Sequence, residues 1–180
     1  HGLTRLVDRP QWFVVEGGSR AYVERMIAPF SDRIRLSSPV ERIARHTGGV
    51  DVTVRDRPAE RFDRVVIAAH SDQALRMLDD PSDAEREVLG NIRYKKNDAV
   101  LHTDTSLLPS TKRAWASWNY VVPSRPAEKV IVTYDMNALQ RIDGAGTTFC
   151  VSLNPGDRVD PSRVLYRTTY AHPLYTAESV

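Results

Sequence analysis

The consecutive residues His70, Ser71 and Asp72 carry the three side-chain groups of a hydrolytic triad. In such a triad the nucleophile and its base converge in space, which neighbours in the sequence cannot normally do. The chain also lacks the GxSxG turn that exposes a serine nucleophile in one large class of hydrolases. We therefore expect Ser71 or Asp72 to cap a helix rather than to take part in hydrolysis.

A second candidate pair, His102 and Asp104, would point to the same face of a strand, because they are two residues apart. That spacing could begin a metal site. Zinc sites need three or four protein ligands, however, and His46, Asp135 and His172 are scattered along the chain. No metal site is predicted, and His102 is left either as a structural residue or as part of a substrate cavity.

The densest group of aromatic residues lies between positions 115 and 120. On a strand, Trp118 and Tyr120 would share one face, whereas Trp115 and Asn119 would lie on the other. Rings that hold an apolar substrate and an amide that orients its polar end would suit a substrate cavity. The same residues would also suit an ordinary sheet core with a hydrogen-bonded amide. Both interpretations remain open from the sequence.

The elements that position these residues are clearest between residues 33 and 78. Gly48-Gly49 predicts a hairpin, because apolar and polar residues alternate after it. The continuously apolar run Val65–Ala69 predicts a strand that is covered on both faces, as in a parallel sheet. Its small final residues would let a ligand approach the backbone at the carboxyl end. A helix is predicted to follow.

The first thirty residues predict a short strand and a helix. The strand is expected at 12–15, and Ser19 is expected to cap the helix. Met26 and Phe30 are part of an apolar helical stripe and are expected in the core. Gly17-Gly18 is either a phosphate-binding turn or a tight connection between strand and helix, of which the second is favoured because GxGxxG is not completed.

The second half of the chain has a different pattern. Ser82 and Glu85 predict a capping box for a helix that ends near Gly90. Strands separated by Pro and Gly then predict an antiparallel sheet. These strands are expected at 94–104, 114–122, 129–134, 147–153 and 164–170, with a helical turn at 137–142. We expect a domain boundary near residues 89–93.

Composition restricts the class of protein without naming a function. Of the 180 residues, 41% are hydrophobic and 27% are charged, which is ordinary for a globular protein. The net charge is +2 with no basic stripe among interleaved aromatics, so nucleic-acid binding is not predicted. One cysteine, Cys150, excludes an intrachain disulfide and fits a reducing, cytoplasmic location. The apolar runs are too short to span a bilayer, and no signal peptide is recognised.

The order of several motifs resembles one enzyme family. The pattern PV-x-x-I, V-x-V and D-x-V-V-x-A resembles the central FAD-domain segment of flavin-containing amine oxidases. The segments VEGGSRAYV, IAAHSDQAL, LGNIRYKKNDAVLHTD and AWASWNY resemble a bacterial subfamily of FAD-binding, amine-oxidase-like oxidoreductases. The family's Gly-rich dinucleotide fingerprint and its later flavin-contacting segment are not in the chain, which is expected to be an internal fragment of a larger enzyme.

The resemblance implies a fold, a cofactor and site residues. The fold class would be α+β, with part of an α/β FAD-binding domain at residues 1–90 and an antiparallel substrate-domain sheet at 91–180. FAD would lie near Val40, Ala68, Ala69 and His70, with the backbone of Val40 at its adenine end. The substrate cavity would include His102, Trp118, Asn119 and Tyr120.

The implied function is an FAD-dependent oxidoreductase in which the flavin abstracts a hydride from a small or lipid-like substrate. Because the cofactor supplies the chemistry, no catalytic side chain is identified. The fragment alone is expected to be inactive, and its partner would be the remainder of the same polypeptide. The alternative is a non-catalytic α+β binding module. An exposed apolar patch on the sheet, without a cavity near Ala69, would favour that alternative.

Overall fold

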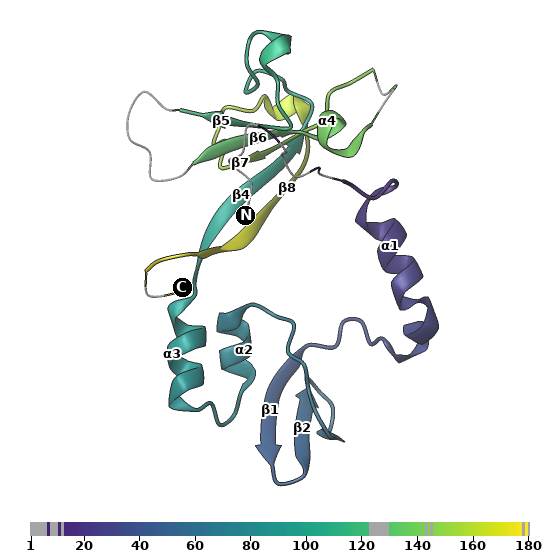
Figure 1. Cartoon of the computed structure of the whole chain (residues 1–180), viewed down its shortest axis with the longest axis vertical. Helices are drawn as coiled ribbons and strands as arrows, with labels where there is room; N and C mark the ends of the chain where they lie inside the picture. The colour runs from purple at the N-terminus through teal and green to yellow at the C-terminus, as the bar shows by residue number, and fades with distance from the viewer. Residues whose placement is uncertain are drawn as a thin grey trace. The chain divides into compact units, whose positions relative to one another are not determined.

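The computed structural model describes residues 7, 11, 13–122, 130–142, 144, 146–177 and 179 (Figure 1). Its contacts divide the chain into two compact units. We call residues 33–97 and 170–180 the hairpin unit, and residues 1–32 and 98–169 the sheet unit. The described part contains four α-helices and two antiparallel sheets, so the predicted α+β class is confirmed. The assignment of 1–90 and 91–180 to two enzyme domains stays a prediction.

The hairpin unit contains a three-stranded antiparallel sheet. Its strands are β1 (Val40–His46), β2 (Gly49–Val54) and β3 (Glu60–Phe62), in that order. The predicted hairpin is confirmed, but its turn lies one residue earlier than Gly48-Gly49: His46 is opposite Gly49 in the register, which leaves residues 47–48 as the turn. Glycine is required at position 49 because a Cβ there would lie 2.6 Å from the Phe62 carbonyl oxygen. Ile43 and Val50 are almost completely buried and form the core of this sheet.

Two helices follow the sheet in the hairpin unit, α2 (Ser71–Met77) and α3 (Asp83–Asn91). The predicted capping box of α3 is confirmed: the Glu85 N–H donates to Ser82 Oγ at 3.2 Å, and the Ser82 N–H donates to a Glu85 carboxylate oxygen at 2.8 Å. Helix α3 continues through Gly90. The N-cap of α2 is His70, so the predicted cap at Ser71 or Asp72 is wrong by one or two positions.

The chain between α2 and α3 is tied to the edge of β1. The Asp79 N–H donates to the Ile43 carbonyl oxygen at 3.0 Å, and Leu78 forms a parallel bridge with Ile43. Arg42 donates to both carboxylate oxygens of Asp79, at 2.7 and 2.6 Å. Arg45 reaches Glu85 at 2.8 Å, and the hydrogen bonds from Arg45 and Ser82 lower the pKa of Glu85 to about 2. The hairpin and both helices are thereby held together.

The predicted buried strand at Val65–Ala69 is wrong. These residues have no strand assignment, and 91% of Val66 is exposed. The run has the composition of a doubly covered strand, but such a strand exists only if neighbouring strands hydrogen-bond to it. No strand in the described part of the chain pairs with these residues. The segment therefore forms no ladder of hydrogen bonds with another strand, and it lies along one side of a pocket.

The sheet unit is built on five strands in the order β5-β6-β7-β4-β8 (Figure 1). Their bounds are β4 (Arg93–His102), β5 (Trp118–Val121), β6 (Ile131–Asp135), β7 (Cys150–Leu153) and β8 (Val164–Leu174). The first five residues of β4 and the last five of β8 belong to the hairpin unit by contacts. The pairs β5–β6, β6–β7 and β7–β4 are antiparallel, as the sequence predicts. The predicted helical turn is α4 (Met136–Gln140). Position 129 of the predicted third strand lies outside the described residues.

Three predictions for the N-terminal part of the sheet unit are wrong. Helix α1 (Gly18–Ile27) has Gly17 at its N-cap, so Ser19 lies in the first turn and does not cap it. The predicted core residues Met26 and Phe30 are 66% and 44% exposed. The Gly18 N–H donates to the Val15 carbonyl oxygen at 3.0 Å, as a tight connection requires. Trp12 lies outside the described residues, and residues 13–15 form no strand.

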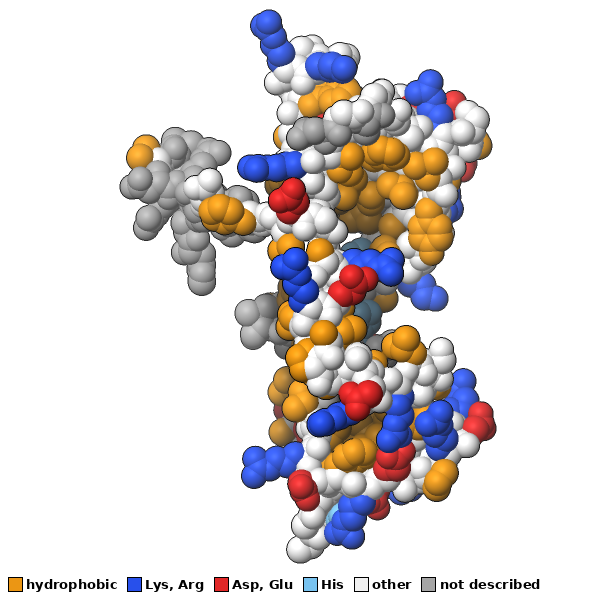
Figure 2. Space-filling model, turned by 90° about the vertical axis from the view of Figure 1, so that its right-hand side faces the viewer, with side chains coloured by type: hydrophobic (Ala, Val, Ile, Leu, Met, Phe, Trp, Pro, Cys, Tyr) orange, Lys and Arg blue, Asp and Glu red, His pale blue; other side chains and the backbone are white. Residues whose placement is uncertain are grey.

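Hydrophobic side chains remain widely exposed. Figure 2 shows one face of the molecule, on which they gather over a broad area in the part that contains the five-stranded sheet. Exposed large hydrophobic residues occur in both units, among them Phe13 at 83% and Leu36 at 83%. Large hydrophobic side chains are therefore exposed in both units.

The contrast between Ile43 and Val66 gives a stability test. Ile43→Ala should lower the free energy of unfolding by about 2–5 kcal/mol, because it opens a cavity beneath the tie between β1 and Asp79. Val66→Ala, at an exposed position, should change it by less than about 0.5 kcal/mol. Urea unfolding of both variants measures the difference. Equal losses would show that residues 65–69 are packed after all.

Candidate functional site

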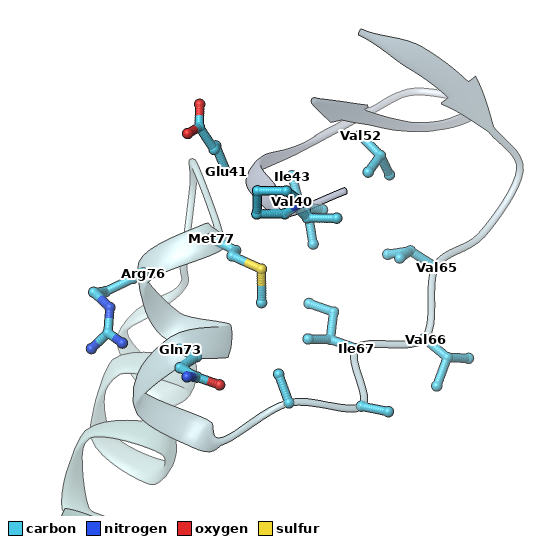
Figure 3. Close-up of a pocket in the computed structure, with 13 residues that line it drawn as sticks. Val40, Glu41, Ile43, Val52, Val65, Val66, Ile67, Gln73, Arg76 and Met77 are labelled. Atoms are coloured by element: carbon cyan, nitrogen blue, oxygen red, sulfur yellow. The ribbon is translucent and has the colours of Figure 1, made fainter. Parts of the chain in front are cut away.

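The hairpin unit holds a pocket of about 720 Å³ (Figure 3). Three elements surround it: the first two strands of the hairpin, the extended segment 65–69, and one side of α2. Its lining residues are Pro39, Val40, Glu41, Ile43, Val52, Val65, Val66, Ile67, Ala68, Ala69, Gln73, Arg76 and Met77. The volume lies within the usual range for sites that bind small molecules and cofactors.

The inner surface of this pocket is apolar. In Figure 3, the side chains of Met77, Ile67 and Ile43 point towards the space between the elements, whereas those of Glu41 and Arg76 point away from it. The Arg76 guanidinium is paired with Asp72 at 2.8 Å, one helical turn earlier on α2. Gln73 adds an amide to the helical side of the lining. An apolar site with one or two polar groups can hold a flat heterocycle and fix its orientation.

Three of the four predicted cofactor-binding residues meet at this pocket. Val40 lies on the hairpin side, and Ala68 and Ala69 lie in the extended segment. Both alanines are exposed, so their small side chains leave the backbone open to a ligand. His70 does not line the pocket. Its ring stacks on Tyr94, with centroids 4.4 Å apart and an angle of 8° between the planes.

The structure separates the four residues predicted for a substrate cavity. Trp118 and Tyr120 are 62% and 51% exposed on one face of the five-stranded sheet. Asn119 and His102 are buried on the other face, at 9% and 0% exposed. Alternation along the strand therefore places the pairs on opposite sides, as the sequence predicts for Trp118, Tyr120 and Asn119. Trp115 precedes β5, and its Nε1–H donates to the Pro109 carbonyl oxygen at 2.7 Å.

A hydrogen-bonded polar network occupies the buried face of the sheet. His102 Nε2 lies 2.9 Å from Ser152 Oγ, which lies 2.7 Å from Thr133 Oγ1, so the network joins β4, β7 and β6. The Asn119 amide is fully engaged: Oδ1 accepts from the Ala116 N–H at 3.1 Å, and Nδ2 donates to the Ala116 and Thr133 carbonyl oxygens. Such satisfaction is what buried polar groups require, and it gives Asn119 a structural role.

Ionisation in this region is shifted by burial. Burial lowers the pKa of His102, and the nearby charge of Asp104 opposes this only in part. Within the described residues, Nδ1 of His102 has no hydrogen-bond partner. Burial opposes ionisation of Asp104 too, but N–H groups of Asp160 and Ser106 outweigh it, so the pKa of Asp104 is lowered. Burial also raises the pKa of the Cys150 thiol to about 11, which makes it a poor nucleophile.

The pocket and the network include residues that the sequence analysis did not identify. Gln73 and Met77 are spaced four residues apart on α2, so the helical period starting at Ala69 could have indicated that both face one side. Ser152 and Thr133 lie at alternate positions of short strands, but no local pattern shows which strands are neighbours. Among the described residues, no group of three or more His, Cys, Asp or Glu side chains could hold a metal ion.

Comparison with known proteins identifies the family. The model of the family described as flavin containing amine oxidoreductase matches residues 3–111 of the 180. Because the match covers more than half of the chain, the protein belongs to this family. No curated protein matches the sequence. None of the helices in the described residues is long and apolar enough to cross a bilayer.

The burial of His102 makes the stability of the sheet depend on pH. Its pKa is lower in the folded protein than the ordinary value of 6.5, so the unfolded chain binds the proton more readily. Stability is therefore fully present above about pH 6.5 and is lost as the pH falls through the folded pKa. Carboxylates such as Asp104 add their own loss only at lower pH, near or below about 4.

We therefore expect His102→Gln to weaken the pH dependence of the melting temperature between pH 7 and 5. The difference between the two proteins at pH 8 reports the packing and the hydrogen bond to Ser152 that the variant alters. That difference should shrink as the pH falls. Parallel melting curves across this range would show that His102 does not titrate on unfolding as proposed.

Proposed function

We propose that this chain is part of an FAD-dependent oxidoreductase of the amine oxidase type. The observation that carries the proposal is the pocket, because Val40, Ala68 and Ala69 reach it from separate segments. The family match gives the class of enzyme, a flavin-containing oxidoreductase. FAD as the particular flavin, the hydride transfer and the kind of substrate are our proposals.

The residues at the pocket fit the adenosine end of FAD. Apolar walls from the hairpin and α2 would contact the heterocycle, and the backbone near Val40 would meet its polar edge. The small side chains of Ala68 and Ala69 would allow the cofactor to approach the chain. His70, stacked on Tyr94, would fix the start of α2 beside it. The GxGxxG sequence that usually holds the pyrophosphate does not occur in the 180 residues.

When bound, the flavin supplies the two-electron chemistry by accepting a hydride from the substrate, and it is reoxidised later by an electron acceptor. The chain's own residues would bind and orient the cofactor and the substrate. The pocket walls would contact the cofactor, and Trp118 and Tyr120 would present rings to a small or lipid-like substrate. His102 and Asn119, predicted for the same cavity, would act from the buried face by fixing the strands.

The division of labour along the chain follows the same proposal. Residues 1–90 would contribute to the FAD-binding part and residues 91–180 to the substrate-binding part. The whole enzyme would include further segments of the same polypeptide, and the isolated chain would be inactive. The single cysteine, buried at position 150, fits a reducing cytoplasmic location.

A non-catalytic binding module is the second candidate. The observation that favours it is the exposed apolar face of the sheet unit, on which Trp118 and Tyr120 lie. Against it stands the pocket at Ala69, because a module that only binds a partner through its sheet has no need of that cavity. A pocket of this size together with the family match favours the flavoenzyme.

The full-length protein should be yellow, and its visible spectrum should show oxidised flavin that bleaches under anaerobic conditions with a substrate. Amines and unsaturated lipids are the two classes to compare. The 180-residue chain alone should lose FAD on gel filtration, because it lacks the motif that holds the pyrophosphate. A colourless full-length protein that takes up no added FAD would overturn the proposal.

Ala69→Leu in the full-length enzyme should weaken FAD binding by at least tenfold, about 1.4 kcal/mol, because three added carbons would occupy the approach to the backbone. The melting temperature of the flavin-free protein should hardly change, because Ala69 is exposed. Ala84→Leu, at an exposed position on α3, is the matched control. If both variants retain normal FAD affinity, the cofactor does not lie against residue 69.

A further inference from the structure

The segment on one side of the candidate cofactor pocket is anchored at its carboxyl end by a residue that does not line the pocket. Residues 65–69 make no backbone hydrogen bond to another described segment. Directly after them, His70 and Ser71 mark the start of α2, and both contact Tyr94 of β4. Tyr94 follows Ser71 by 23 positions in the chain, and all of these residues belong to the hairpin unit.

Tyr94 holds the start of α2 in two ways. Its hydroxyl oxygen accepts the Ser71 N–H at 3.0 Å and lies 3.4 Å from Ser71 Oγ. Its ring stacks on the His70 imidazole, with 4.4 Å between the centroids. Ser71 Oγ also lies 3.4 Å from the carbonyl oxygen of Ile92, just before β4. The hydroxyl group and the ring of one side chain therefore fix two consecutive residues.

The hydrogen bond to the Ser71 N–H meets a need of the backbone. Ser71 is the first residue of α2, and the first N–H groups of a helix find no acceptor within it. Because only 9% of Ser71 is exposed, this N–H requires an acceptor from the protein. Phenylalanine at position 94 could still stack on His70 but could not accept this hydrogen bond. The two contributions of Tyr94 can therefore be separated by substitution.

We propose that Tyr94 is a positioning residue for the cofactor, because it fixes the start of α2 and thereby holds Ala68 and Ala69 at the pocket. The inference rests on the proposed oxidoreductase function and adds to it a residue that does not touch the ligand. A binding site keeps its affinity only when the residues around it are themselves held in place. No strand in the described part of the chain pairs with residues 65–69, so the hydrogen bond at Ser71 gives them a fixed point two residues after Ala69.

The test is FAD binding by the flavin-free full-length protein and three variants, titrated at a temperature at which all of them are folded. Tyr94→Phe keeps the ring but leaves the Ser71 N–H without its acceptor, so FAD affinity should fall by about tenfold. Tyr94→Leu also loses the stack and should weaken binding by about thirtyfold. Ser82→Ala is the matched control, because it removes the side-chain cap of α3 in the same unit and should lower stability while leaving FAD affinity within about twofold.

A second measurement needs no flavin. Hydrogen–deuterium exchange of a peptide covering residues 65–71 should be about tenfold faster in flavin-free Tyr94→Phe than in the wild-type protein, because the Ser71 N–H loses its partner. The same peptide should exchange at the wild-type rate in Ser82→Ala. Melting temperatures confirm that each variant folds.

Wild-type FAD affinity in folded Tyr94→Phe would overturn the inference, and so would unchanged exchange of residues 65–71. Equal losses of affinity in Tyr94→Phe and Ser82→Ala would show only a general effect of stability, which also overturns it. If the wild-type protein takes up no FAD, the oxidoreductase proposal itself fails, and the exchange measurement still decides whether Tyr94 holds the segment.

Discussion

The candidate cofactor pocket depends on one edge of one strand. At that edge the Asp79 N–H donates to the Ile43 carbonyl oxygen. Beside it, the Arg42 guanidinium donates to both carboxylate oxygens of Asp79. The ion pairs are exposed and would contribute little alone. Their geometric effect is larger, because they fix where α2 ends relative to the hairpin. Val40 on the hairpin and Met77 at the end of α2 line the same pocket.

The extended segment on the open side of the pocket has a different origin. Its apolar run could serve as a doubly covered strand, yet nothing in the described part of the chain pairs with it. The same segment ends in Ala68 and Ala69, which line the pocket. Small exposed residues at such a place keep the backbone accessible to a ligand. Because no other strand pairs with this segment, its backbone stays accessible, and the segment is suitable for binding a cofactor.

On its covered side the sheet unit combines apolar packing of Val100, Cys150 and Ile131 with a buried hydrogen-bond network. A chain of contacts from His102 through Ser152 to Thr133 crosses three strands inside the protein, and Asn119 secures β5 beside them. Because a buried polar group costs free energy when it loses its partner, these contacts strongly favour one register. On the other face of β5, the aromatic side chains of Trp118 and Tyr120 remain more than half exposed.

The sequence by itself determined the local elements of this protein. The hairpin before Gly49, the capping box of Ser82 and Glu85, and the antiparallel strands after residue 93 follow from turn chemistry, capping and alternation, all of which act over a few residues. Motif order also indicated the flavin-containing family. The residues it predicted near FAD, Val40, Ala68 and Ala69, line one pocket, and their contact with the cofactor stays a prediction. Only the tertiary structure decided which faces are covered and which segments pair. Periodicity shows that a strand has two faces, but it does not show which face will be covered. The burial of Asn119 and the exposure of Trp118 could therefore not be predicted from the sequence. Composition likewise marked residues 65–69 as a strand, although a strand exists only when another segment supplies the hydrogen bonds, and that depends on what the fold brings alongside.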